Sequence, residues 1–180
     1  KDNLEITIKS ISLLVDKCDI IITTGGVSVG EEDHIKKAIT SLGKLNLWKI
    51  RMKPGKPLAF ATIKNTFFIG LPGNPVSSFI TFIIFALPFI RKTQGRNDIK
   101  TKSFKVRANF ECKKHKPRVE YARAKIEYEN NIAFAKLYPK QGSDVMSSLV
   151  WADGIIEIPE NITFKKGYLL DYYPLERLII

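Results

Sequence analysis

The sequence predicts an α/β protein in which a mostly parallel, three-layer α/β domain is followed by a small all-β domain. In the first half of the chain, short apolar runs alternate with helical patterns, and this alternation is typical of parallel sheets. After the polar stretch 95–102 the apolar period falls to two, which is typical of short antiparallel strands. We therefore expect an α/β domain over residues 1–97 and a β-barrel-like domain over residues 98–180.

The composition fits a folded protein of one or two domains, with 180 residues, 44% hydrophobic and 26% charged. A net charge of +11 favours anionic partners, but the basic residues are scattered and no nucleic-acid-binding motif is present, so we expect no nucleic-acid partner. Cys18 and Cys112 lack metal-ligand spacing, which fits a reducing cytoplasm. The most apolar run, residues 79–90, is shorter than the roughly 20 residues that span a bilayer. We expect it to be a buried core helix, with no membrane partner.

The elements of the first half follow from apolar spacing. Four apolar residues recur every three or four positions and share one face of a helix over residues 3–17. They are Leu4, Ile8, Ile11 and Val15. The further elements expected are a strand over 19–23, a helix over 33–42, a strand over 45–52, strands over 58–63 and 66–71 joined by a turn, and a helix over 75–93.

The second half alternates apolar and polar residues in short runs. This pattern predicts about five strands with turns between them and a single helical turn at 144–150. The strands are expected within FKVRANF, VEYARAKIEYE, IAFAKL, GIIEIP and GYLLDYYPL.

A glycine loop, GGVSVGEEDH, begins at the carboxyl end of the first expected strand. Gly25, Gly26 and Gly30 allow crowded or left-handed backbone and bring N–H groups close to an anion. The helix that opens near Asp33 would add its positive end. Such a loop holds a phosphate-bearing ligand or serves only as a tight turn.

The motif MKPGKP places two lysines three residues apart across a Pro-Gly turn. Both ammonium groups, from Lys53 and Lys56, can then face one anion. The alternative is a surface hairpin with two solvated lysines.

Three motifs in this order, TTGGVSVGEEDH, WKIRMKPGKPLAF and GLPGNPVSSFITF, resemble the molybdopterin molybdotransferases, the molybdenum-insertion enzymes related to the E domain of gephyrin. The resemblance continues through KPRVEYARAKI and PKQGSDVMSSLVWADGIIEIP and so covers nearly the whole chain. It implies a cytoplasmic, homodimeric enzyme of molybdenum cofactor biosynthesis. Such enzymes insert molybdate into adenylylated molybdopterin and release AMP with the help of Mg²⁺.

The resemblance also implies roles for single residues. Lys53 and Lys56 hold molybdate, and Asp33 is the catalytic and Mg²⁺-linked aspartate, with helix capping as its alternative role. The residues expected to bind the cofactor are Gly25, Gly26, Ser28, Gly30, Pro57, Pro72, Gly73, Asn74, Pro75, Ser77, Arg118, Arg123 and Ser143, with Ser147 or Ser148 beside Ser143. For Asn74 and Pro75 the alternative is an ordinary helix start.

Members of this family normally carry further domains before this region, and their molybdopterin-binding domain begins with an earlier strand. We therefore expect the α/β domain to be incomplete and N-terminally truncated, and the chain alone to be incompetent as an enzyme. A second function of the same fold stays open, namely a non-catalytic scaffold module that binds a pterin or another anion. A basic nucleic-acid-binding protein is a third, which the charge permits and the motifs do not support.

Overall fold

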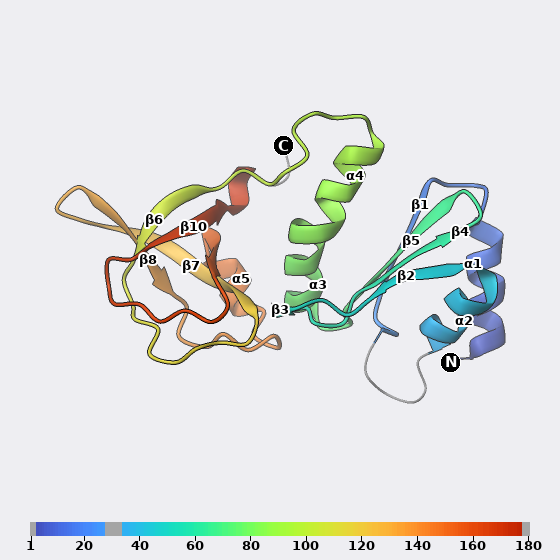
Figure 1. The fold of residues 1–180 in the computed structure, drawn as a ribbon, viewed down its shortest axis with the longest axis horizontal. Helices are drawn as coiled ribbons and strands as arrows, with labels where there is room; N and C mark the ends of the chain where they lie inside the picture. Colours follow the sequence, from blue (N-terminus) through green and yellow to red (C-terminus); the bar gives the residue numbers. More distant parts are fainter. Residues whose placement is uncertain (1–2, 28–33, 178–180) are drawn as a thin grey trace. The chain divides into compact units, whose positions relative to one another are not determined.

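The computed structural model describes residues 3–27 and 34–177 (Figure 1). The chain divides into two compact units. Unit 1 consists of Lys1–Ile50 and Gly55–Phe82, and unit 2 consists of Arg51–Pro54 and Ile83–Ile180. This division lies within the long apolar helix, whereas the domain boundary expected from composition at residues 97/98 stays a prediction.

Unit 1 is built on a four-stranded sheet with the order β1-β5-β4-β2. Its strands are β1 (Ile20–Thr24), β2 (Lys44–Trp48), β4 (Ala59–Ile63) and β5 (Thr66–Leu71). Among these described strands β1 and β5 pair in parallel, while β4 pairs antiparallel with both β5 and β2. The sheet is therefore mixed, and the expectation of a mostly parallel sheet is wrong. The reason is local: the turn at Lys64, which has a φ of 50°, folds β5 straight back on β4, and hairpin strands are antiparallel.

Two helices of unit 1, α1 (Leu4–Leu14) and α2 (His34–Leu42), lie together on one face of the sheet (Figure 1). Their buried residues pack with those of β4 and β5 in one apolar cluster. The cluster includes Ile11, Val15, Ala38, Ile39, Ala61 and Phe68. The predicted stripe on the first helix is thereby confirmed, and its N-cap is Asn3, whose Oδ1 accepts from the N–H of Glu5 at 2.8 Å. A second helical layer, and with it the three-layer arrangement, stays a prediction.

The predicted helix over residues 75–93 is confirmed as one continuous stretch of 19 residues. It comprises α3 (Pro75–Thr81), a π-helical segment η1 (Phe82–Ala86) and α4 (Leu87–Thr93). By length and composition this helix could cross a membrane, whereas the apolar run 79–90 considered in the sequence is too short to do so. In the structure, 39% of the most apolar stretch of the helix is buried. Core helices of soluble proteins share these properties, so the absence of a membrane partner stays a prediction.

Unit 2 is a small β-barrel-like domain, as the period-two pattern predicts. Its sheet has the order β3-β7-β8-β6-β10-β9, and a further pairing of β7 with β9 closes the ring. The strands are β3 (Met52–Lys53), β6 (Phe104–Ala108), β7 (Val119–Glu129), β8 (Ile132–Leu137), β9 (Gly154–Ile158) and β10 (Leu169–Pro174). The expected helical turn is α5 (Ser147–Trp151), and a 3-10 turn, η2 (Leu175–Arg177), follows β10. Inward residues such as Val106, Ala124, Ile156 and Leu170 form the core.

The strand expected over residues 45–52 is interrupted, so that expectation is wrong as one element. Lys49 has a φ of 74°, which ends β2 at Trp48. The chain then enters unit 2, where Met52 and Lys53 pair in parallel with the start of β7. The residues on either side of this segment are joined in unit 1, where the N–H of Ile50 donates to the carbonyl of Lys56 at 2.9 Å.

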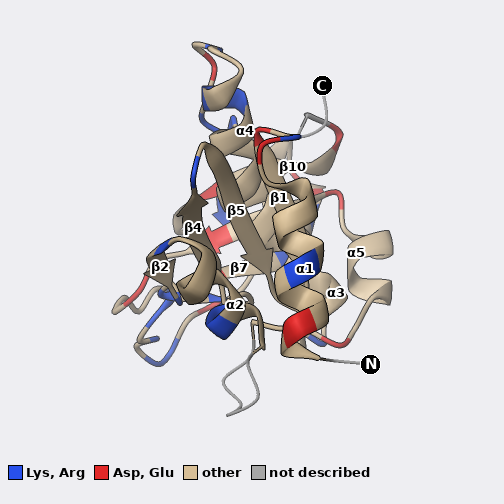
Figure 2. Cartoon of the chain, turned by 90° about the vertical axis from the view of Figure 1, so that its right-hand side faces the viewer, with Lys and Arg blue, Asp and Glu red and all other residues tan. Residues whose placement is uncertain are grey.

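Basic positions are spread over several elements, including α1, α2 and α4, rather than gathered in one tract (Figure 2). This distribution agrees with the scattered pattern in the sequence and shows no basic stripe along a single element.

Candidate functional site

One candidate site is a pair of glycine loops in unit 1. Because β1 and β5 are parallel and Thr24 is in register with Leu71, both strands end at the same edge of the sheet. The N–H of Gly25 donates to the carbonyl of Leu71 at 3.0 Å. A Cβ added to Gly73 would lie 3.2 Å from the Cα of Gly25. The loop after β1 and the loop after β5 therefore touch through their glycines.

The conformation of the first loop requires glycine at two positions. Gly25 and Gly26 have φ values of 85° and 69°, in the left-handed region. A Cβ on Gly26 would also lie only 2.5 Å from Cγ1 of Ile35. The backbone at this edge is thus packed closely against its neighbours, and the side chain of Ile35 fills the space beside Gly26.

Three buried polar atoms border these loops and have no hydrogen-bond partner among the described residues. They are Oγ1 of Thr23 in β1, Nδ1 of His34 at the start of α2, and Oδ1 of Asn74 just before α3. Buried polar groups are nearly always hydrogen-bonded, because leaving one unpaired costs about 1–3 kcal/mol. Groups of this kind fit a polar ligand that both donates and accepts hydrogen bonds, since Oδ1 of Asn74 can only accept. The side chain of Asn74 does not cap α3, although Pro75 does occupy its first turn.

Other predicted residues of this region are placed as follows. Pro72 and Ser77 are buried, Gly73 and Pro75 are exposed, and Pro57 is half-buried. Ser28, Gly30 and Asp33 lie outside the described residues, so the predicted Mg²⁺ site at Asp33 stays a prediction. Within residues 3–27 and 34–177 no group of three or more His, Cys, Asp or Glu side chains could hold a metal ion.

A separate candidate site is a charged cluster in unit 2, centred on Glu120. The parallel pairing of β3 with β7 sets Lys53 opposite Glu120, and the Lys53 Nζ lies 3.2 Å from Oε1 of Glu120. The Lys116 ammonium donates to the other oxygen, Oε2. The side chain of Glu120 is only 6% exposed. One buried carboxylate therefore holds two lysines, one on each oxygen.

The two lysines keep this carboxylate ionised. Burial raises the pKa of Glu120, but the hydrogen bond and charge of Lys116, together with the charge of Lys53, outweigh it. The net effect holds the pKa of Glu120 below its ordinary value. Two cations against one anion leave a net charge of +1 on the cluster, which suits an anionic ligand.

Arg123 is buried behind this cluster and is engaged by the loop and helix that follow β8. Its Nε donates to Oγ of Ser148 at 3.0 Å, and its Nη2 donates to the carbonyl of Gly142 at 2.9 Å. The side chain of Gln141 bonds both the N–H and the carbonyl of Arg123, at 3.0 and 2.9 Å. Burial lowers the pKa of Arg123, while the charge of Glu120 raises it. The residue is 1% exposed, and its predicted role as an oxyanion ligand stays a prediction.

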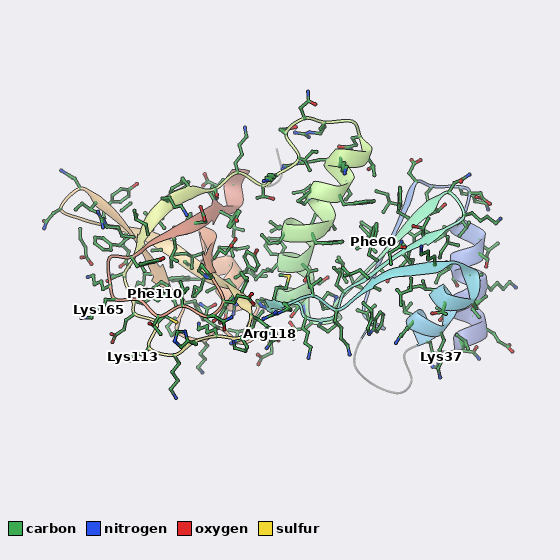
Figure 3. The ribbon with its side chains drawn as sticks, in the orientation of Figure 1. Lys37, Phe60, Phe110, Lys113, Arg118 and Lys165 are labelled. Atoms are coloured by element: carbon green, nitrogen blue, oxygen red, sulfur yellow. The ribbon has the colours of Figure 1, made fainter. Side chains whose placement is uncertain are left out.

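Arg118 and Ser143 are half-buried. Arg118 lies just before β7 (Figure 3), and within the described part of the chain its guanidinium has no hydrogen-bond or ion-pair partner. Its role and that of Ser143 stay predictions.

The two lysines of MKPGKP belong to different units: Lys53 to unit 2 and Lys56 to unit 1. Lys56 is exposed. Lys53 is half-exposed but paired with Glu120, so a hairpin with two freely solvated lysines does not describe it. Their joint contact with one anion stays a prediction.

Sequence reasoning missed Glu120, Lys116 and Gln141. A signal for the first was present, because period-two alternation puts Glu120 on the same side of β7 as Ala122 and Ala124, both of which are buried. A carboxylate at an inward strand position needs a charged partner. Lys53, its partner in β3, could not be predicted, because a local sequence pattern does not show which distant strands pair.

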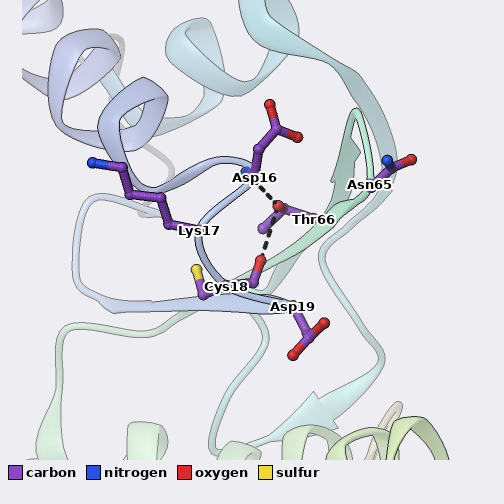
Figure 4. Close-up of a pocket in the computed structure, with 6 residues that line it drawn as sticks. All are labelled: Asp16, Lys17, Cys18, Asp19, Asn65 and Thr66. Atoms are coloured by element: carbon purple, nitrogen blue, oxygen red, sulfur yellow. Dashed lines mark hydrogen bonds between the residues drawn. The ribbon is translucent and has the colours of Figure 1, made fainter.

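A hollow of about 300 Å³ lies at the opposite end of β1 and β5 from the glycine loops, between Asp16, Cys18 and Thr66 (Figure 4). The Oγ1 of Thr66 accepts from the N–H of Asp16 at 3.1 Å and donates to the carbonyl of Cys18 at 3.0 Å. These bonds satisfy the buried hydroxyl of Thr66 locally, so this group does not need a ligand.

Comparison with known proteins bears on both candidate sites. A family model described as a probable molybdopterin-binding domain matches residues 1–92, which is more than half of the chain. The chain belongs to the molybdopterin molybdotransferase family. A second model, for the C-terminal region of MoeA (domain IV), matches residues 105–175. The glycine loops therefore lie in the region matched by the first model, and Glu120 and Arg123 lie in the region matched by the second.

The relatives and solved structures of this family that match the chain are longer than the chain itself. The molybdopterin molybdenumtransferase of Haemophilus influenzae is 44% identical over 108 residues, covering 59% of this chain and 27% of that protein. The molybdenum cofactor synthesis protein cinnamon of Drosophila melanogaster is 35% identical over 163 residues, covering 88% and 27%. A crystal structure of the MoeA protein of Pyrococcus horikoshii is similar with a TM-score of 0.73 and 25% identity, covering 96% and 41%. The chain thus spans about a quarter of the length of these two relatives.

Proposed function

We propose that the chain is the part of a molybdopterin molybdotransferase that binds adenylylated molybdopterin and molybdate. In the reaction of the whole enzyme, molybdate is inserted into the pterin and AMP is released. The observation that carries this proposal is the contact of the Gly25 and Gly73 loops, bordered by polar atoms of Thr23, His34 and Asn74 that have no hydrogen-bond partner among the described residues. The homologues named as molybdenumtransferases support the same reaction class.

In this proposal each part of the site has a chemical task. Backbone N–H groups of the glycine loops other than that of Gly25, which already donates to the carbonyl of Leu71, bind the phosphates of the adenylylated pterin. Lys53 and Lys56 bind molybdate and neutralise its charge. Asp33 is proposed to hold Mg²⁺, which when bound would neutralise phosphate charge as AMP leaves.

The role of Lys53 and Lys56 is tested by titrating molybdate into the full-length protein and its Lys53→Ala and Lys56→Ala variants in a calorimeter. Losing one charge-assisted contact should weaken binding by roughly 1.5–3 kcal/mol, about ten- to hundredfold. Lys105→Ala is the matched control, because Lys105 is an exposed lysine of unit 2 paired with Asp171 at 2.7 Å. Unchanged affinity in both site variants would refute the molybdate site.

The role of Asp33 is tested separately with Asp33→Asn. Asparagine is as good a helix N-cap as aspartate, so folding stability should fall by no more than about 0.5 kcal/mol. Cofactor formation by the full-length protein should nevertheless drop sharply. Wild-type turnover in this variant would leave capping as the role of Asp33, and wild-type ligand binding without any turnover in the parent protein would favour a non-catalytic scaffold.

We also propose a cytoplasmic homodimer that acts on small molecules, without a nucleic-acid or membrane partner. Sedimentation velocity of the full-length protein would test the dimer, since a monomer at all concentrations would contradict it.

A further inference from the structure

The carboxylate of Glu120 bridges two lysines that come from different segments of unit 2. Lys53 pairs with Oε1 at 3.2 Å, and Lys116 bonds to Oε2. Because both ammonium groups contact one carboxylate, they lie close to each other. The proposed function uses only Lys53 of this pair.

The segment that carries Lys116 is fixed by its backbone. The N–H of Asn161 donates to the carbonyl of Lys116 at 2.8 Å, and Nη2 of Arg51 donates to the carbonyl of Pro117 at 3.2 Å. Arg51 lies one residue before β3, so the same segment that brings Lys53 to β7 also holds the chain beside Lys116. The closeness of the two lysines is therefore built into the main chain and does not depend on two flexible side chains meeting by chance.

Both lysines keep a face toward solvent. Their side chains are 52% and 36% exposed for Lys53 and Lys116, whereas that of Glu120 is 6% exposed. An ammonium group has three donors, and Glu120 engages only part of them. The carboxylate cannot readily be displaced, because leaving it without its cations would strand a buried charge. An added anion would thus bind the outward donors while Glu120 holds both lysines from within.

We propose that Lys116 is a third lysine of the oxyanion site and contacts the same molybdate as Lys53, with Glu120 as the positioning residue for both of these lysines. This inference rests on the proposed function and adds a residue to it. The competing explanation is that Lys116 only neutralises Glu120 and never touches the ligand.

Removing Glu120 first separates the two explanations, because Lys116 then has no carboxylate left to neutralise while the positioning of Lys53 is already lost. If Lys116 only neutralises Glu120, adding Lys116→Gln to Glu120→Gln leaves the molybdate affinity of the Glu120→Gln variant unchanged. If Lys116 contacts the anion, the double variant binds more weakly than Glu120→Gln alone, because that contact is missing.

The experiment is calorimetric titration of molybdate into the full-length protein, with thermal unfolding of each variant measured alongside. We expect Lys116→Gln to bind molybdate at least about tenfold more weakly than the wild type, and the double variant at least about tenfold more weakly than Glu120→Gln, as expected for a lost charge-assisted contact. Lys105→Gln should stay within about twofold of the wild type, since its ion pair with Asp171 is exposed and outside the cluster. Should Lys116→Gln fail to fold, the double variant carries the test, because it has no stranded charge.

Two outcomes would overturn the inference, and they are distinguishable. Equal affinity of the double variant and Glu120→Gln, with Lys53→Gln still weakened, would reject Lys116 as a contact and leave the proposed site intact. Wild-type affinity in Lys53→Gln as well would reject the molybdate site as a whole.

Discussion

The glycine loops of unit 1 and the Glu120 cluster of unit 2 are both proposed to receive an anion, yet they are made from different parts of the polypeptide. The loops bring glycine main chain together at a sheet edge, where Gly25 and Gly73 touch. The cluster offers ammonium groups held by a buried carboxylate on a barrel strand. One part depends on the absence of side chains, and the other depends on their charge.

This difference determines how each part can fail. The loops carry their cost as left-handed backbone, so they are sensitive to any added Cβ and insensitive to pH. The cluster contains a buried charge, which is unfavourable unless it is paired. Its stability is therefore sensitive to the loss of a partner lysine and to protonation of Glu120. The comparison can be tested with four stability measurements, ordered from the largest expected effect to the smallest.

Arg123→Ala should have the largest effect, on unit 2. The substitution leaves a cavity and removes the guanidinium N–H groups that donate to Oγ of Ser148 and to the carbonyl of Gly142. We therefore expect the free energy of unfolding to fall by about 3–5 kcal/mol. Arg107→Ala is the control, because Arg107 is exposed and makes one bond, to the carbonyl of Gly167. Urea denaturation of both variants measures the difference. A loss below about 1 kcal/mol for Arg123→Ala would show that Arg123 does not hold the 141–148 segment.

Gly26→Ala should have the next largest effect, on unit 1. The new Cβ meets Ile35 at 2.5 Å in a left-handed backbone, so strain and overpacking add to about 2–4 kcal/mol. Gly95→Ala is the matched control, since Gly95 has a φ of 73° but no atom within 4 Å of the added Cβ. It should cost only the strain, about 1–2 kcal/mol. Thermal unfolding compares the two, and equal losses would mean that the contact with Ile35 is irrelevant.

Glu120→Gln should cost about 1–2 kcal/mol near pH 7, as expected for hydrogen bonds to a charged group. Because the folded-state pKa of Glu120 lies below the unfolded value, its ionised form stabilises the protein above about pH 4.3. That contribution disappears as pH falls through the folded-state pKa. The difference between wild type and variant, measured by denaturation from pH 7 to pH 3, should therefore shrink toward acid. A difference that stays constant would contradict the ion-pair account.

Lys136→Ala should have the smallest effect. Lys136 pairs with Glu127 at 2.9 Å in the same barrel, but both side chains are exposed, so the expected loss is below about 1 kcal/mol. A larger loss of unfolding free energy would show that an exposed ion pair of this barrel can stabilise the protein as much as the buried Glu120 cluster does.

Several elements could be predicted because their signals are local. The stripe that contains Ile11 and Val15, Pro75 as the opening residue of the long helix, and the period-two strands of the β-domain each depend on neighbouring residues. The glycine loop after β1 was predicted for the same reason, since Gly25 and Gly26 must adopt a backbone that other residues disfavour.

The direction of the strands and the partners of the charges were not predictable in this way. The turn at Lys64 was expected, but the mixed sheet became evident only from the pairing of β4 with both β2 and β5. The interruption at Lys49 was missed, because nothing in LNLWKIRM marks a left-handed residue.

The sequence by itself determined the family, the helices and strands, and the two motifs that carry glycines and lysines, because these features are encoded within short windows. Only the tertiary structure decided that Gly25 meets Gly73 and that Lys53 and Lys116 share the carboxylate of Glu120. Those contacts join segments distant in the chain, and their geometry is set by the register of β1 with β5 and of β3 with β7. Register depends on the burial of whole strands rather than on any single motif.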